Sequence, residues 1–219
     1  MITYDELRKN ESIKTYISAA DKILSEMGYT EHSFAHVTKV SETAAYILTS
    51  LGYSRHTVEL AKIAGYLHDI GNLVNRIDHS QSGAVMAFRI LDKLGMEAED
   101  IAVIISAIGN HDEGTGIAVN AETAALILAD KSDVRRSRVR NSDLSNFDIH
   151  DRVNYSVIKS DLGLAEENKV VRLTLDIDTK ISSVMDYFEI FLGRMSMCRK
   201  AAETLGLRFK LVINGQNLI

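Results

Sequence analysis

The chain has 219 residues, of which 46% are hydrophobic and 25% charged, as in an ordinary globular protein with a buried core. Its formal net charge of −5 at pH 7 gives no electrostatic case for binding nucleic acid or an anionic membrane surface. A single cysteine excludes an intramolecular disulfide framework, and neither a secretory signal nor a membrane-spanning apolar run is visible. We therefore expect a cytoplasmic protein.

The first part of the chain has the periodicity of amphipathic helices. Thr3 and Glu6 have the spacing of a capping box, which predicts a short helix at the start of the chain. Apolar residues then recur at helical spacing, and glycines such as Gly28, Gly52 and Gly71 follow where helices would end. The longer expected helices cover about residues 13–27, 33–51, 54–70, 80–94, 97–109 and 120–134.

The pattern changes after Arg135. Residues 136–150 lack periodicity and predict an exposed loop, whereas residues 151–161 and 169–178 alternate as strands do, with a hairpin connection between them. A helix over about 179–205 and a third strand over 207–213 complete the pattern. We therefore expect a mainly α protein, with a helical domain in residues 1–140 and a small β-β-α-β appendage in residues 141–219.

The expected C-terminal helix carries an apolar stripe with alternating steps of four and three residues. The stripe consists of Val184, Phe188, Phe191, Met195, Cys198, Ala202 and Leu205. One interpretation is a seam between two copies of the chain, which would give a homodimer. The interpretation that we favour is packing against the appendage's own strands, which places Cys198 in the core rather than in a reactive site.

Histidine and aspartate residues recur at the ends of the expected helices. His68 and Asp69 are adjacent, and imidazole and carboxylate together suit divalent cations such as Mn, Fe, Zn or Mg. Further candidate ligands are His36, His79, His111 and Asp130. Asp130 follows an apolar run, where a buried carboxylate needs a cation. Helices of a bundle build metal sites in this way.

The number of ions depends on how many of these residues take part. His36, His68, Asp69 and Asp130 are enough for one ion, and all six are enough for two that share Asp69. Taken singly, each histidine is more often a packed or surface residue than a ligand, so the prediction depends on the whole set. The remaining histidines fit no pattern, and we expect them at the surface: His32, His56 and His150.

The order of these residues resembles the HD-domain superfamily of metal-dependent phosphohydrolases. The resemblance spans roughly residues 30–140 and lies in four segments: His36-Val37-Thr38-Lys39-Val40, Leu67-His68-Asp69-Ile70-Gly71, Ile108-Gly109-Asn110-His111 and Ala129-Asp130-Lys131-Ser132-Asp133. The six-ligand pattern is similar to that of the branch with two metal ions. Two differences stand out: Asp112 occupies the place of a second histidine in cyclic-dinucleotide phosphodiesterases, and Asn72 the place of a lysine in many members.

The resemblance implies a function and a cofactor. We expect hydrolysis of a phosphoester or phosphoanhydride, with a nucleotide as the expected substrate, by a hydroxide bound to one or two divalent ions (Mn, Fe, Mg or another transition metal). Asp69, His79 and His111 would be the catalytic residues. Lys39, Lys131 and Arg135 would bind the substrate phosphate. The expected partner is thus a small phosphate compound, and neither nucleic acid nor a membrane.

Two other functions stay open. An HD-fold di-iron oxygenase similar to inositol oxygenase would use the same six ligands, although Asn72 in place of a lysine argues against it. A metal-stabilised sensor or scaffold would keep the ligands without turnover and use the appendage as its partner surface. Oxygen consumption identifies the first, and metal-loaded protein without hydrolysis identifies the second.

Overall fold

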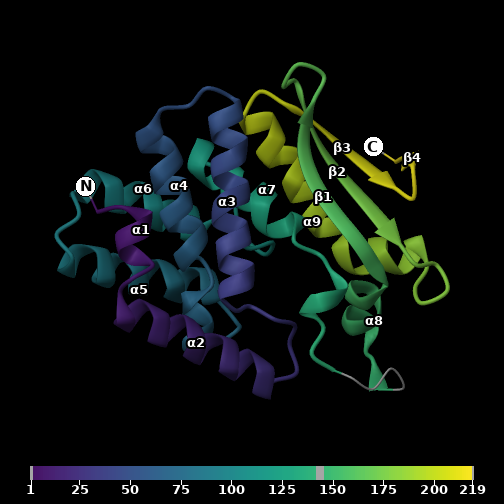
Figure 1. The fold of residues 1–219 in the computed structure, drawn as a ribbon, viewed down its shortest axis with the longest axis horizontal. Helices are drawn as coiled ribbons and strands as arrows, with labels where there is room; N and C mark the ends of the chain where they lie inside the picture. Colours follow the sequence, from purple (N-terminus) through teal and green to yellow (C-terminus); the bar gives the residue numbers. More distant parts are fainter. Residues whose placement is uncertain (1, 142–145, 219) are drawn as a thin grey trace.

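The structure is a computed structural model that describes residues 2–141 and 146–218, so that residues 142–145 of the expected loop lie outside the description. A bundle of helices forms one side of the molecule and a twisted sheet the other, with the long helix α9 packed between the sheet and α7 (Figure 1). The mainly α architecture with a β appendage is confirmed. No helix in the described ranges has the length and apolar composition needed to cross a bilayer.

The helices of the bundle follow the sequence prediction closely. They are α1 (Tyr4–Leu7), α2 (Glu11–Glu26), α3 (Phe34–Ser50), α4 (Arg55–Leu67), α5 (His79–Lys93), α6 (Ala98–Gly109) and α7 (Ala121–Ser132), with a 3-10 turn η1 (Ile70–Leu73) after α4. Most begin at a side chain that accepts hydrogen bonds from the first free backbone N–H groups: Thr3, Asn10, Ser33, Ser54 and Asn120. These caps explain why the predicted boundaries are accurate to a few residues.

Close packing of α3 against α4 holds the first two histidines together. A Cβ atom on Gly65 of α4 would lie 2.9 Å from the Cα atom of Ser41 on α3, so only glycine fits there. The hydroxyl of Ser41 donates to the carbonyl oxygen of Lys62 at 2.9 Å, which satisfies a polar group inside this contact. As a result, His36 on α3 and His68 at the end of α4 are both buried in the same region.

The sheet has four strands in the order β1-β2-β3-β4: β1 (Val157–Ala165), β2 (Val170–Ile177), β3 (Arg208–Ile213) and β4 (Gln216–Asn217). β1 pairs antiparallel to β2, and α9 (Val184–Thr204) is the crossover that brings β3 parallel to β2. The predicted β-β-α-β order is therefore confirmed, with β4 as a short addition. The connection between β1 and β2 is shorter than predicted, because β1 continues to Ala165.

The prediction of a strand over residues 151–156 is wrong. This segment belongs to helix α8 (Ile149–Ser156), which the carboxylate of Asp148 caps by accepting from the backbone N–H of Asp151. Val153, Tyr155 and Val157 alternate along the chain, as residues on one face of a strand do. Val153 and Val157, both buried, are also four residues apart, which is about one turn of a helix, so the same spacing fits a helix. The loop before α8 is not wholly exposed either: it contains the 3-10 turn η2 (Arg136–Arg138), and Arg138 is buried.

The apolar stripe of α9 is buried within the chain. Phe191, Met195 and Cys198 are almost fully inaccessible, and α9 packs against α7 on one side and against β2 and β3 on the other. Cys198 is therefore a core residue, as expected. The hydrophobic core is continuous from the bundle through α9 to the sheet.

Candidate metal centre

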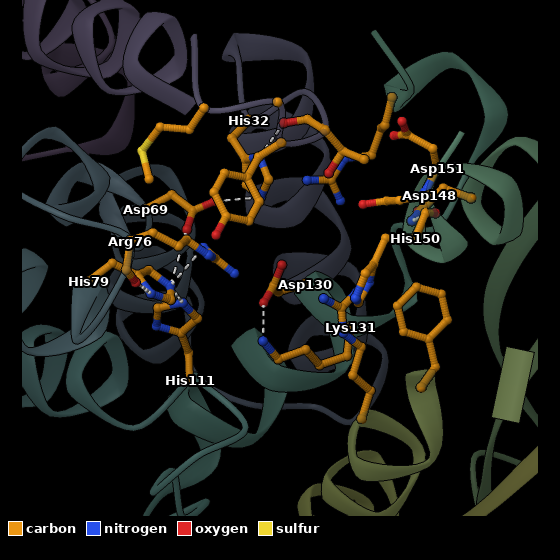
Figure 2. Close-up of a pocket in the computed structure, with 18 residues that line it drawn as sticks. His32, Asp69, Arg76, His79, His111, Asp130, Lys131, Asp148, His150 and Asp151 are labelled. Carbon is orange, nitrogen blue, oxygen red and sulfur yellow. Dashed lines mark hydrogen bonds and ion pairs between the residues drawn. The ribbon is translucent and has the colours of Figure 1, made fainter. Parts of the chain in front are cut away.

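All six predicted metal ligands lie together in the structure. They come from the ends of five helices: the first turn of α3 (His36), the end of α4 (His68 and Asp69), the start of α5 (His79), the residue pair after α6 (His111) and the last turn of α7 (Asp130). Four of them are visible around the cavity in Figure 2. The histidines and Asp69 are buried, and the side chain of Asp130 is 12% exposed.

The first group of ligand atoms surrounds one oxygen of Asp69. Its Oδ2 atom lies 3.5 Å from Nε2 of His36 and 3.1 Å from Nε2 of His68. Oδ1 of Asp130 approaches the same two nitrogens, at 3.3 and 3.7 Å. His36, His68 and Asp130 have ligand atoms within 4.8 Å of one another, a spacing that one ion could bridge after a small contraction.

The other oxygen of Asp69 faces a second pair of histidines. Oδ1 lies 3.5 Å from Nε2 of His79, whose Nε2 lies 3.2 Å from Nε2 of His111. His111 also forms a compact triad with His68 and Asp69. Asp69 is thus the residue that joins the two groups.

Each of the four histidines has its ring fixed through Nδ1. The partners of Nδ1 are Asp133 Oδ2 for His36 (2.8 Å), the Gly65 carbonyl for His68 (2.8 Å), the Arg76 carbonyl for His79 (3.1 Å) and the Ile108 carbonyl for His111 (2.6 Å). A carbonyl oxygen or a carboxylate only accepts, so Nδ1 carries the proton in every case. Nε2 is then left as the lone-pair atom, which is the arrangement of metal-binding histidines.

This arrangement fits a divalent cation. The Nε2 atoms of His36 and His68 are 3.3 Å apart, and those of His79 and His111 are 3.2 Å apart. Two lone pairs that face each other at this distance repel unless a positive charge, either a shared proton or a metal ion, lies between them. The donor set of imidazole and carboxylate suits Mn, Fe or Zn.

The charges around the centre agree with this conclusion. Burial alone would raise the pKa of Asp69, but His68, His32 and His36 hold it well below its usual range, so Asp69 is an ionised carboxylate. Burial, with His68 and a nearby lysine, holds the pKa of His111 well below its ordinary value, so His111 is a neutral imidazole. Burial disfavours the charged form of His68, yet Asp69 and Asp130 raise its pKa to about 10. Positive charge is therefore favoured between His68 and these carboxylates.

Asn72 holds the carboxylate of Asp69 in place through hydrogen bonds. Its Nδ2 donates to Oδ1 and to the backbone carbonyl of Asp69, both at 2.9 Å. Its Oδ1 in turn accepts from Nη1 of Arg76 at 3.2 Å. The residue at which the chain departs from the family pattern thus orients Asp69 and brings the guanidinium of Arg76 to the centre.

The prediction of a surface position is wrong for His32. Its side chain is 12% exposed and Nε2 lies 4.0 Å from Oδ2 of Asp69. Its backbone N–H donates to Asp21, and its Nδ1 to the carbonyl of Thr30, which turns the ring inward. His56 is exposed as expected and pairs with Asp100. His150 is exposed too, but it faces the cavity described next.

A cavity of about 420 Å³ opens beside the ligands. Asp69, His79 and His111 lie on one side of it, whereas Asp148, His150 and Asp151 lie across from them (Figure 2). This second wall is formed by α8 with its cap and by α9, through Phe191 and Arg194. Four cationic side chains line the cavity: Arg76, Lys131, Arg138 and Arg194. A volume of this size suits a small ligand, and the cations suit an anionic one.

Lys131 is the one predicted phosphate-binding residue in this cavity. Its side chain is 5% exposed, and its ammonium group pairs with Oδ2 of Asp130 at 2.8 Å and with Oε2 of Glu113 at 3.3 Å. Glu113 also pairs with Nε of Arg194 at 2.5 Å. A series of ion pairs thus connects Arg194 on α9, through Glu113 and Lys131, to the candidate ligand Asp130.

The structure does not bring Lys39 and Arg135 into the cavity. Both point to Oδ1 of Asp133, Lys39 from 2.8 Å and Arg135 from 2.9 Å, and both line a separate hollow. Sequence reasoning placed them at the site because each stands near a ligand in the chain. It missed Arg76, Arg138 and Arg194. For Arg76, the position between Asp69 and His79 was an available clue, whereas nothing in the sequence marks Arg194.

The family model for the HD domain matches residues 33–153, more than half of the chain. The chain belongs to the HD-domain family. The resemblance to the HD-domain superfamily of metal-dependent phosphohydrolases is thereby confirmed, and the match includes all six candidate ligands and the first residues of α8.

Two curated relatives are similar to this HD-domain protein over part of their length. The uncharacterized protein MJ1020 of Methanocaldococcus jannaschii is 27% identical over 159 residues, which are 63% of this chain and 61% of that protein. Ribonuclease Y of Enterococcus faecalis is 29% identical over 119 residues, 54% of this chain and 21% of that protein. The chain therefore spans less than two thirds of either relative.

A solved structure also shares similarity with the chain. It is the crystal structure of a predicted HD superfamily hydrolase from an uncultured Thermotogales bacterium. The matched region covers 61% of this chain and 75% of that hydrolase. The TM-score is 0.45 and the sequence identity is 24%.

Proposed function

We propose that this HD-domain protein is a hydrolase with two divalent ions that cleaves a phosphoester or phosphoanhydride bond in a small phosphate compound, with nucleotides as the first substrate class to test. The observation that carries the proposal is the position of Asp69, whose two carboxylate oxygens face two different groups of histidines. A carboxylate in this position is suited to bridge two ions.

The proposed ligands divide between the two ions. Oδ2 of Asp69 would bind one ion together with His36, His68 and Asp130, and Oδ1 would bind the other together with His79 and His111. Two such ions supply Lewis acidity, which activates a water molecule and neutralises phosphate charge. Asp69, His79 and His111 therefore remain the proposed catalytic residues.

The side chains that would position the substrate differ from those expected from the sequence. Arg76 lies beside the second group, with Nη1 3.4 Å from Nε2 of His79, and its planar fork suits phosphate oxygens. Lys131 and Arg194 contribute further positive charge from the floor and the far wall of the cavity. We propose these three as the phosphate-binding residues, in place of Lys39 and Arg135.

Water exclusion and orientation would come from the far wall. Phe191 is buried behind this wall, and the guanidinium of Arg194 stacks over its ring at 4.4 Å. A substrate with its phosphate at the ligands would place its remaining part against this wall. Substrate selection would then depend on residues of α8 and α9.

The test is phosphate or nucleotide release by protein loaded with Mn²⁺ or Fe²⁺. The panel holds dinucleoside polyphosphates, nucleoside mono- and triphosphates, a generic phosphodiester and a short RNA, the last because one relative is Ribonuclease Y. Wild type is compared with Asp69→Ala and with a matched control, Asp92→Ala, on the exposed side of α5. We expect release that is lost in Asp69→Ala and kept in the control.

The other outcomes select the alternatives. Metal-loaded wild type that consumes oxygen but releases no phosphate would be an oxygenase. Full metal occupancy without either reaction would favour the sensor or scaffold. Equal turnover by Asp69→Ala and wild type would contradict the proposed role of this carboxylate.

A further inference from the structure

A second hollow, of about 430 Å³, lies at the junction of the bundle and the sheet and shares no lining residue with the metal cavity. Four cationic side chains line it: Lys39 from α3, Arg135 and Arg136 from the start of η2, and Lys159 from β1. Two hydroxyl residues, Ser137 and Ser160, complete its polar lining. Cations from three separate segments thus meet at one concave surface, although the chain as a whole is acidic.

Arg136 is held in place before any ligand arrives. Its Nε donates to the carbonyl of Tyr155 at 2.6 Å, and its guanidinium stacks over the Tyr155 ring at 4.5 Å. Asp178 forms only a long ion pair with this guanidinium, because its Oδ2 lies 4.0 Å from Nη2, beyond hydrogen-bond distance. A fixed guanidinium without a close counter-ion is well suited to bind an anion, since little side-chain entropy is lost.

Lys159 is the second cation without a close carboxylate partner. It is exposed on β1 and forms no ion pair with any residue in the described part of the chain. Lys39 and Arg135 differ, because each pairs with buried Asp133, and Arg135 also approaches Glu31 at 3.4 Å. The two acids lie behind these cations, and the Lys39 side chain remains 41% exposed.

We propose that this hollow is a binding site for a tetrahedral oxyanion, the phosphate group of a small molecule, distinct from the metal centre. The guanidinium of Arg136 and the ammonium groups of Lys39 and Lys159 can donate to different oxygens of one such group. The inference does not depend on the proposed hydrolytic function, because the site needs neither metal ions nor turnover.

The hollow is connected to the metal centre through one carboxylate. Oδ1 of Asp133 accepts from Lys39 and Arg135, while Oδ2 accepts from Nδ1 of His36, a metal ligand. An anion would compete with Asp133 for the two cations, and Asp133 would then polarise His36 more strongly. A more strongly polarised imidazole is a better ligand, and a nearby negative charge also favours a cation. Anion and metal should therefore bind with positive coupling.

The first test is sulfate binding by isothermal titration calorimetry, at ionic strength held constant with sodium chloride. Sulfate has the geometry of phosphate and cannot be hydrolysed, and inorganic phosphate serves as a second probe. Arg136→Gln with Lys159→Gln should weaken binding by about tenfold or more, as expected for lost hydrogen bonds between charged groups. The matched control is Lys169→Gln with Lys200→Gln, which removes the same charge from exposed positions outside the hollow.

Each outcome decides the proposal. Wild-type affinity in the hollow variant, or an equal loss in the control, would overturn it by showing binding elsewhere or only general charge attraction. Sulfate binding that is lost in Arg194→Gln instead would assign the anion to the metal cavity. If circular dichroism shows that the double variant is unfolded, sulfate binding by the single variant Lys159→Gln tests the proposal. The Lys159 side chain is exposed, so its replacement should not disturb the fold.

The coupling has its own measurement. The affinity for Mn²⁺ is determined in sodium sulfate and in sodium chloride at equal ionic strength. We expect an increase of about fivefold in sulfate for wild type, at the lower end of typical couplings between sites. The increase should vanish in Lys159→Gln. An unchanged affinity for Mn²⁺ in wild type that binds sulfate would refute the link through Asp133 and leave an anion site without influence on the metal.

Discussion

Gly71 is the position at which a single methyl group should separate the metal ligands. This residue lies in η1, directly after the His-Asp pair, and packs against the first turns of α5. A Cβ atom built on Gly71 would lie 2.6 Å from the hydroxyl of Ser82, and closer still to the carbonyl oxygen of His79 and the backbone nitrogen of Gly83. Two of these three atoms are backbone, so a side-chain rotation cannot relieve the contact.

The expected cost of Gly71→Ala follows from this geometry. Real Cβ atoms essentially never approach other atoms within 3.0 Å, and all three neighbours are nearer than that, so α5 must move away from η1. Overpacking in a close-packed interior costs about 1–3 kcal/mol, and we expect about 3 kcal/mol because backbone has to shift. For a chain of this length that corresponds to a melting temperature lower by roughly 6–12 °C. The movement also takes His79 away from Asp69.

The assay is thermal unfolding by circular dichroism together with metal content after dialysis. The control is Gly109→Ala at the end of α6, where the nearest atom would be the Ala84 Cβ at 3.7 Å, an ordinary contact. Alanine there should melt at or above the wild-type temperature, since it lowers the entropy of the unfolded chain. If Gly71→Ala melts like wild type and retains its metal, the close approach of η1 to α5 is not needed to form the centre.

Four further predictions test the centre and the core. Asp133→Asn should weaken metal binding about 10- to 100-fold by loosening the orientation of His36, as titration with Mn²⁺ would show. Removing bound metal with a chelator should lower the unfolding free energy by about 2.7 kcal/mol if the free ion stood at a hundred times its dissociation constant, and adding metal back should restore it. Burial raises the pKa of the Cys198 thiol to about 12, so a thiol reagent at about pH 8 should react with Cys198 in guanidinium but not in the native protein. Ile104→Ala removes a fully buried side chain of α6 and should cost about 2–5 kcal/mol in denaturant unfolding.

The convergence of the candidate metal ligands could be predicted because most of them are tied to a local sequence feature. His68 and Asp69 follow the apolar run that makes α4, and Asp130 ends the apolar run of α7. Helix ends are marked by caps and glycines, so the sequence places these residues on the structure before the tertiary fold is known. Convergence on one point was then a consequence of bundle packing.

The substrate-binding residues could not be predicted in the same way. Lys39 lies on the same helix face as His36, which stands three residues earlier, and both contact Asp133, but Lys39 pairs with Oδ1 of this buried carboxylate and lines the separate hollow instead of the cavity. Arg194 is distant in sequence from every ligand and reaches the cavity only because α9 packs on α7. His32 was misplaced for a related reason, since the loop before α3 folds inward through a hydrogen bond from the His32 backbone to Asp21 that no local pattern reveals.

The same contrast explains where selectivity of this HD-domain protein should reside. The family match ends at residue 153, whereas Phe191 and Arg194 of the cavity wall lie on α9. Arg194 also connects through Glu113 to Lys131, which pairs with the metal ligand Asp130. The part of the chain beyond the family pattern therefore contributes a wall of the cavity and a charge chain to the metal centre. HD-domain proteins that share the six candidate ligands but differ in α9 should therefore bind the same metal ions and accept different substrates.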